Sequence, residues 1–93
     1  MARNANIPLD PSVWTQITNA DVTALRVQSL SGCTIRLMAT AGAVAPTDDE
    51  GALTLMPNAI LASDLTLADL WPGVAGANRV YAKGAGDVSV SHA

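Results

Sequence analysis

Few side chains in this sequence can do chemistry, and they lie far apart along the chain. His92 is the one imidazole and Cys33 the one thiol. Catalysis by a histidine needs an orienting acid and a nucleophile within reach, and the sequence points to no such set. Cys33 falls on the predicted inner face of a strand with Ile35 and Leu37, where a cysteine behaves as a small hydrophobe. We therefore expect that the protein is not an enzyme.

Three adjacent acids, Asp48, Asp49 and Glu50, are the best candidate for a metal site. Carboxylates beside a glycine can hold Ca²⁺, although the ligands of a calcium loop usually alternate along the chain. A solvated loop tip is the other interpretation. The glycine-containing stretches 73–77 and 83–86 match neither a dinucleotide-binding nor a P-loop spacing. We expect no cofactor and no metal, with calcium at the acidic run left open.

The composition indicates one domain with a thin core. Of the 93 residues 49% are hydrophobic, yet there is no phenylalanine, and the aromatic residues are Trp14, Trp71 and Tyr81. Alanine and valine bury little area each, and the transfer free energy is roughly 25 cal/mol per Å². A lone copy would gain stability from association, so we expect a homo-oligomer. We expect Trp71 to fill the core, and Trp14 to do the same or to contact a neighbouring subunit.

The charge pattern argues against two classes of partner. Five basic residues against eight acidic ones give a net charge of −3. Nucleic acids and anionic membranes both attract basic surfaces, which this chain lacks. The first residues have no long apolar core of the signal-peptide kind, and no stretch of about 18 apolar residues is present. We expect a protein made in the cytoplasm that binds neither nucleic acid nor membrane.

The N-terminal segment differs in pattern from the rest of the chain. Residues 1–11 contain Pro8 and Pro11, and proline fixes φ and removes a backbone donor. We therefore expect an extended N-terminal arm over residues 1–11 and a single β domain over residues 12–93.

Alternation of apolar and polar residues with a period of two predicts strands in that domain. Segments 23–28 and 33–40 alternate in this way, and a turn at 29–32 would join them as an antiparallel hairpin. Arg26 and Arg36 would then share the outer face. Two neighbouring cations need an acid or a partner between them, so this face is a candidate for a binding surface.

The second half of the chain predicts further short strands around one helical turn. Residues 53–55 alternate, and Thr66 and Asp69 have the spacing of a capping box, which predicts a helical turn near 66–71. Residues 79–92 predict two more strands with a tight glycine reversal between them. In all, we expect an all-β fold: a small antiparallel β-sandwich or barrel of five to seven short strands.

The strand expected at 87–92 ends the sequence and carries almost no charge. An exposed edge of this kind invites uncontrolled pairing with other chains. We therefore expect it to be held either by its own sheet or by a neighbouring subunit.

Three stretches resemble small virion proteins of tailed bacteriophages, namely "VTALRVQSLSG", "DLTLADLWPGVAGANRVYAKG" and "VSVSHA". The general plan is similar to capsid decoration (cement) proteins, which are small, β-built, poor in charge and rich in Ala, Gly, Pro and Val. The resemblance implies an N-terminal arm that adds a strand to the capsid lattice, and copies that cluster on local symmetry axes. The arm here is shorter and has fewer β-branched residues than that plan requires.

The resemblance implies a structural protein of the virion, on the capsid surface, with the major capsid protein as its partner. The residues expected at the contact are Ile7, Leu9 and Trp14, with Arg26, Arg36 and Arg79 meeting acidic patches. A small tail or neck adaptor subunit, or a head-fibre adaptor, is the first alternative. A carbohydrate-binding adhesion module is the second, and the scarcity of aromatic residues supports it poorly.

Overall fold

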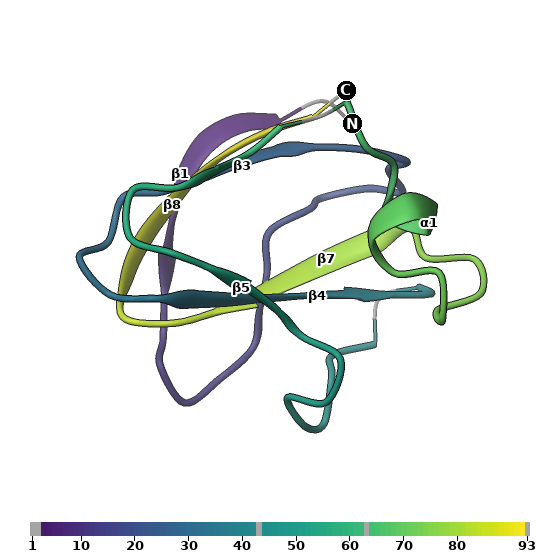
Figure 1. Ribbon diagram of the computed structural model, residues 1–93, viewed down its shortest axis with the longest axis horizontal. Coiled ribbons are helices and arrows are strands. Elements are labelled where there is room, and N and C mark those ends of the chain that lie inside the picture. Colours follow the sequence, from purple (N-terminus) through teal and green to yellow (C-terminus); the bar gives the residue numbers. More distant parts are fainter. Residues whose placement is uncertain (1–2, 43, 63, 93) are drawn as a thin grey trace.

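The computed structural model describes residues 3–42, 44–62 and 64–92, and in that part of the chain it has eight strands and one helix (Figure 1). In chain order these are β1 (Arg3–Leu9), β2 (Thr15–Gln16), β3 (Arg26–Ser29), β4 (Ile35–Thr40), β5 (Leu53–Leu55), β6 (Ile60–Leu61), α1 (Leu67–Leu70), β7 (Arg79–Lys83) and β8 (Gly86–His92). The first sheet has the order β1-β8-β3-β6 and the second sheet the order β2-β7-β4-β5, and all the ladders are antiparallel. The prediction of an all-β fold is confirmed, in its sandwich form. The strand count exceeds the expected five to seven because β2 and β6 have only two residues each.

The two sheets pack face to face over a core of small aliphatic side chains. Val27, Val88 and Val90 point inward from the first sheet, and Leu37 and Val80 from the second, and all five are fully buried. Their sequence neighbours point outward, as alternation along a strand requires. Burial of each such side chain contributes about 1.5–3 kcal/mol. The period-two pattern therefore identified these five inward residues correctly.

The predicted hairpin between the third and fourth strands is wrong. β3 pairs with β6 and β8, whereas β4 pairs with β5 and β7, so the chain changes sheets between Ser29 and Ile35. The same holds for β7 and β8, which the glycine pair Gly84 and Gly86 joins across the two sheets. Alternation tells which residues of a strand face the core, but both sheets share that core. The alternation therefore does not indicate to which of the two sheets a strand belongs.

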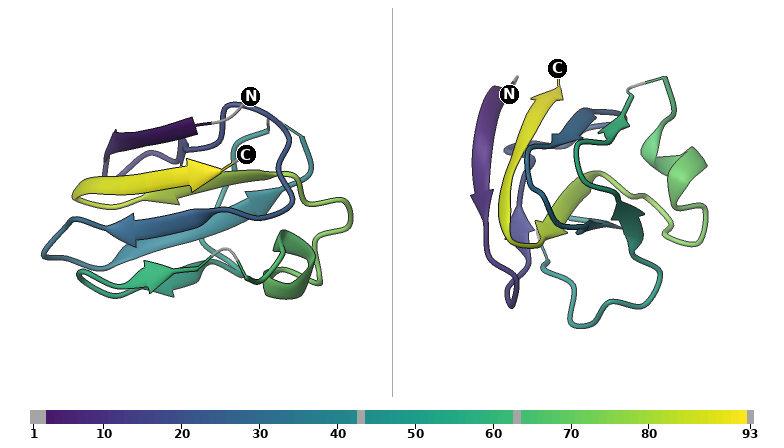
Figure 2. Two further views of the ribbon diagram at one scale, coloured as in Figure 1. Left: turned by 90° about the horizontal axis from the view of Figure 1, so that it is seen from above. Right: turned by 60° about the vertical axis from the view of Figure 1, so that its left-hand side comes forward.

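The N-terminal segment is extended, and it lies in the domain's own sheet. β1 pairs with β8 along its whole length, from Arg3 opposite His92 to Leu9 opposite Gly86 (Figure 2). Its inward side chains Ile7 and Leu9 pack against the core. β8 therefore lies between β1 and β3 as a central strand of the first sheet. Of the two ways in which the last strand was expected to be held, the structure shows the first.

The helical turn expected near 66–71 is present as α1. The Thr66 hydroxyl accepts a hydrogen bond from the backbone N–H of Asp69 (3.2 Å), and the Asp69 carboxylate accepts one from the backbone N–H of Thr66 (3.1 Å). These two bonds complete the predicted capping box. Leu67 and Trp71 are buried in the core, so α1 covers one end of the sandwich (Figure 1). Among the described residues, no helix has the length and apolarity needed to cross a bilayer.

Gly86 is the position where the crossing from β7 to β8 depends on glycine. Its φ is +112°, a backbone conformation that residues other than glycine rarely adopt. A Cβ at this position would lie 2.8 Å from the Cβ of Ser31. The Ser31 hydroxyl also donates to the carbonyl oxygen of Ala85, so Ser31 is held in place.

We expect the substitution Gly86→Ala to lower the free energy of unfolding by about 2–4 kcal/mol, because backbone strain and steric overlap add. Urea unfolding followed by circular dichroism would measure the loss. Gly32→Ala is the matched control, since Gly32 has no positive φ and open space around it. We expect that control to be neutral or to stabilise by up to about 1 kcal/mol. Equal losses from both substitutions would contradict this account.

Candidate functional site

The outer face of the second sheet carries the densest group of charged side chains that the structure shows. Arg36 and Lys83 are directly opposite each other on β4 and β7. The Asp49 carboxylate, which comes from the loop between β4 and β5, accepts a hydrogen bond from Lys83 and lies 3.9 Å from the Arg36 guanidinium. An acid between two neighbouring cations relieves their repulsion. The sequence pattern predicts an acid or a partner between Arg26 and Arg36. That pairing is wrong, because the two arginines lie in different sheets.

Trp14 belongs to the same group. The Lys83 ammonium lies 4.8 Å from the centroid of the Trp14 ring, which is the geometry of a cation–π contact. Trp14 is partly buried. Lys83 thus links the indole of Trp14 to the carboxylate of Asp49, and we name Trp14, Arg36, Asp49 and Lys83 the charged cluster.

A turn between the two sheets leads the chain to Trp14. The backbone N–H of Ser12 (2.8 Å) and its hydroxyl (2.7 Å) both donate to the Asp10 carboxylate. These bonds favour the charged form and lower the pKa of Asp10, with the backbone donor contributing most. The turn therefore holds its shape while Asp10 is ionised.

The remaining residues predicted at a partner contact are dispersed. Ile7 and Leu9 face the core. The Arg26 guanidinium lies on the outer face of the first sheet, 3.4 Å from the Ser89 hydroxyl, and Arg79 makes an ion pair of 2.8 Å with Asp21. The structure therefore brings Trp14 and Arg36 together and separates them from the other four.

The three acids at positions 48–50 make different interactions. Asp49 belongs to the charged cluster, and the Asp48 carboxylate accepts a hydrogen bond from the backbone N–H of Glu50 (3.1 Å). The Glu50 carboxylate has no hydrogen bond or ion pair with any described residue. No three acids, histidines or cysteines gather in the described ranges as a metal site would require.

The two reactive side chains lie apart from this region. Cys33 is exposed, and the prediction that it faces the core is wrong, because β4 begins only at Ile35 and Cys33 lies in the crossing between the sheets. His92 is buried and shares the inward face of β8 with Val88 and Val90, as predicted.

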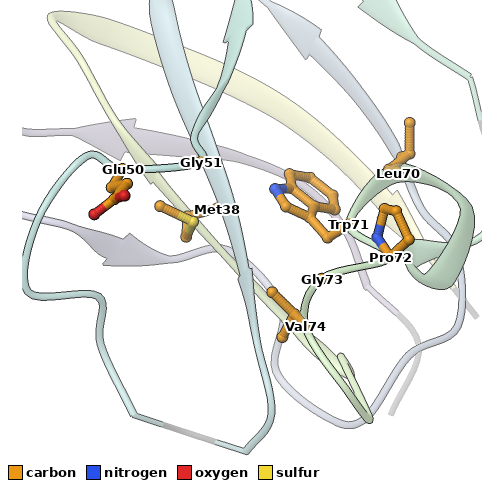
Figure 3. Close-up of a pocket in the computed structure, with 8 residues that line it drawn as sticks. All are labelled: Met38, Glu50, Gly51, Leu70, Trp71, Pro72, Gly73 and Val74. Carbon is orange, nitrogen blue, oxygen red and sulfur yellow. The ribbon is translucent and has the colours of Figure 1, made fainter.

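A pocket of about 350 Å³ lies between β4, the acidic loop and the segment after α1 (Figure 3). It is lined by Met38, Glu50, Gly51, Leu70, Trp71, Pro72, Gly73 and Val74. No local sequence pattern by itself indicates this pocket, because its walls come from three segments far apart in the chain. One signal was available in retrospect: the Pro-Gly pair after Trp71 ends the helix and leaves its last turn open on one side.

The edges of the two sheets differ in length. β6, β2 and β5 are edge strands of two or three residues, whereas the edge strand β1 has seven. Short edge strands discourage pairing with other chains, and a long one offers a row of backbone donors and acceptors. The exposed residues Asn4, Ala5 and Asn6 lie in the middle of β1. Among the described strands, β1 is therefore the edge best suited to accept a further strand.

No known protein family matches the chain, and neither the curated proteins nor the solved structures contain a match to it.

We expect Asp49→Asn to lower the free energy of unfolding by about 1 kcal/mol at low salt, because Arg36 and Lys83 then face each other without an acid. The loss should shrink in about 1 M NaCl, where charges are screened beyond roughly 3 Å. Urea unfolding at both salt concentrations measures this. Asp64→Asn is the matched control, since Asp64 is exposed and its carboxylate makes no hydrogen bond or ion pair with the described residues. If Asp49→Asn lowered the free energy of unfolding equally at both salt concentrations, the loss would not come from the charges of the cluster.

Proposed function

We propose that this protein is a structural component of a tailed-phage virion, a decoration protein that binds the major capsid protein on the outside of the head. The observation that carries the proposal is the long open edge of β1 in a domain whose other described edges are short. The proposal also rests on the resemblance of the sequence to small virion proteins.

The edge of β1 suits the addition of a strand from a partner. A strand added to a sheet edge gains its affinity from main-chain hydrogen bonds, and pockets for alternate side chains give specificity. β1 carries Arg3 at one end and Pro8 near the other, and the residues between them are uncharged. The backbone of this segment is therefore open to an extended segment of the capsid protein.

The outer face of the first sheet supports the same role. The register places small polar side chains on this face across three adjacent strands: Asn4 and Asn6 on β1, Ser89 and Ser91 on β8, and Gln28 on β3. Arg26 on β3 and Asp87 on β8 share this face. The polar side chains between them can form hydrogen bonds to a partner at a lower desolvation cost than charged groups. This face would remain in contact with the shell beside the added strand.

The structure changes which experiment tests the capsid contact. Ile7 and Leu9 pack against the core, so removal of residues 1–10 would damage the fold together with any binding surface. Single side chains on β1 are the sharper test. Lysine on an edge strand opposes the addition of another strand, because its charge would have to be desolvated.

We expect the wild-type protein to co-sediment with shells assembled from the major capsid protein of the same genome. The double variant Asn4→Lys/Asn6→Lys should bind about tenfold more weakly, a loss of about 1.4 kcal/mol. The matched control is Asn19→Lys/Thr47→Lys, which adds the same two charges at exposed loop positions outside the first sheet, and it should bind within about twofold of wild type.

Three results of this experiment would count against the proposal. Failure of the wild-type protein to sediment with shells would contradict capsid decoration, and binding to purified tails instead would favour the adaptor alternative. Equal weakening by both double variants would show that the added positive charge, and not its place on the edge of β1, causes the loss. Circular dichroism of each variant shows whether its fold is intact.

A further inference from the structure

The pocket beside α1 has the chemistry of a binding site. Met38, Leu70, Pro72 and Val74 supply apolar walls, and Trp71 supplies an aromatic one (Figure 3). Its volume of about 350 Å³ lies at the small end of the range of ligand pockets, about 300–1,000 Å³. The pocket therefore has room for one or two amino-acid side chains.

The Trp71 indole N–H is open to solvent, because its nitrogen has no partner among the described residues and is not one of the buried polar atoms that lack one. Trp71 is only 6% exposed, and its nitrogen makes no hydrogen bond with any described residue. In Figure 3 the nitrogen edge of the ring points toward Met38 and the acidic loop, across the pocket. An indole N–H that faces a pocket and is open to solvent is able to donate to an acceptor on a ligand.

The rim of the pocket carries one uncommitted acid. Asp49 is held by two cations and Asp48 by the loop backbone, whereas the Glu50 carboxylate contacts no charged or donor group of the described chain. Glu50 lines the pocket next to Met38. A carboxylate at the mouth of an apolar pocket favours a ligand with a positive charge beyond its apolar part.

We propose that this pocket binds a peptide segment of a partner protein in which an apolar residue precedes an arginine or a lysine. The apolar side chain lies against Met38 and Val74, and a backbone carbonyl of the segment accepts the hydrogen bond from Trp71. The basic side chain pairs with Glu50. A peptide is the occupant that supplies an apolar group, a carbonyl acceptor and a cation within so short a distance.

This site is separate from the edge of β1. β1 lies on one side of the domain and α1 on the other (Figure 2). The pocket is lined by Leu70 of α1 and by the segment that follows it. One copy is therefore able to hold two partner segments at once. The proposal goes beyond capsid decoration and does not depend on it.

The test uses the full-length protein labelled with ¹⁵N and three blocked peptides: Leu-Pro-Arg, Leu-Pro-Gln and Gly-Gly-Arg. The two indole N–H signals report on the two tryptophans separately, and a Trp14→Phe variant assigns them. We expect Leu-Pro-Arg to shift the Trp71 signal with a dissociation constant of about 1 mM. The Trp14 signal should stay in place.

The contribution of Glu50 follows from a double-mutant cycle. Glu50→Gln should weaken binding of Leu-Pro-Arg by about threefold and leave binding of Leu-Pro-Gln unchanged, because an exposed ion pair is worth a modest factor. Asp64→Asn removes the same charge away from the pocket and should change neither affinity. Gly-Gly-Arg should bind at least about fivefold more weakly, since it lacks the apolar group.

Three outcomes would overturn the proposal. They are no shift of the Trp71 signal at about 10 mM Leu-Pro-Arg, equal shifts of both tryptophan signals, and equal weakening by Glu50→Gln and Asp64→Asn. Failure of this site would leave co-sedimentation with shells intact. Loss of co-sedimentation would leave the peptide titration intact, so the two proposals fail separately.

Discussion

The contact between two layers of fully buried aliphatic side chains holds the rest of the molecule in place. Val27, Val88 and Val90 of the first sheet meet Leu37 and Val80 of the second. Such side chains bury little area each, so the sandwich depends on complete filling more than on a few large anchors. Trp71, the residue directly after α1, adds a large aromatic group to this core. The helical turn and the residue after it are therefore part of the core, and Trp71 also lines the pocket beside α1.

The outer face of the second sheet follows from the register of the core. Once Leu37 and Ala82 point inward as partners, Arg36 and Lys83 must meet on the opposite face. Two adjacent cations require an acid, and the loop between β4 and β5 supplies Asp49. These contacts of Asp49 hold the loop against the sheet, and the next two residues, Glu50 and Gly51, line the pocket. The pairing of Asp49 with the two cations of the sheet thus also positions the Glu50 carboxylate, which makes no ion pair with the described residues of the sheet.

The sequence predicts the features that depend on residues close together in the chain. It does not predict those that depend on contacts between distant segments. The capping box of Thr66 and Asp69, the inward valines of β8 and the polar outer residues could all be predicted, because each depends on spacing within a few residues. The sheet to which β4 belongs could not, since alternation is the same on both sides of a shared core. Cys33 was misplaced because the end of a strand is less well defined than its middle. The pocket and the Asp49 contact join segments that only the tertiary fold brings together.

The unequal edges limit how copies of this domain can associate. Pairing of two β1 strands edge to edge in antiparallel fashion would give an isologous two-fold dimer, and the short strands β2, β5 and β6 offer little to extend it further. A strand from another protein would use the same row of backbone groups. Self-association through β1 and addition of a partner strand therefore compete for one site. An oligomer that also binds a scaffold through β1 must use a different surface for its own contacts. The thin core makes such contacts valuable, and many copies on one lattice bind tightly even when each contact is weak.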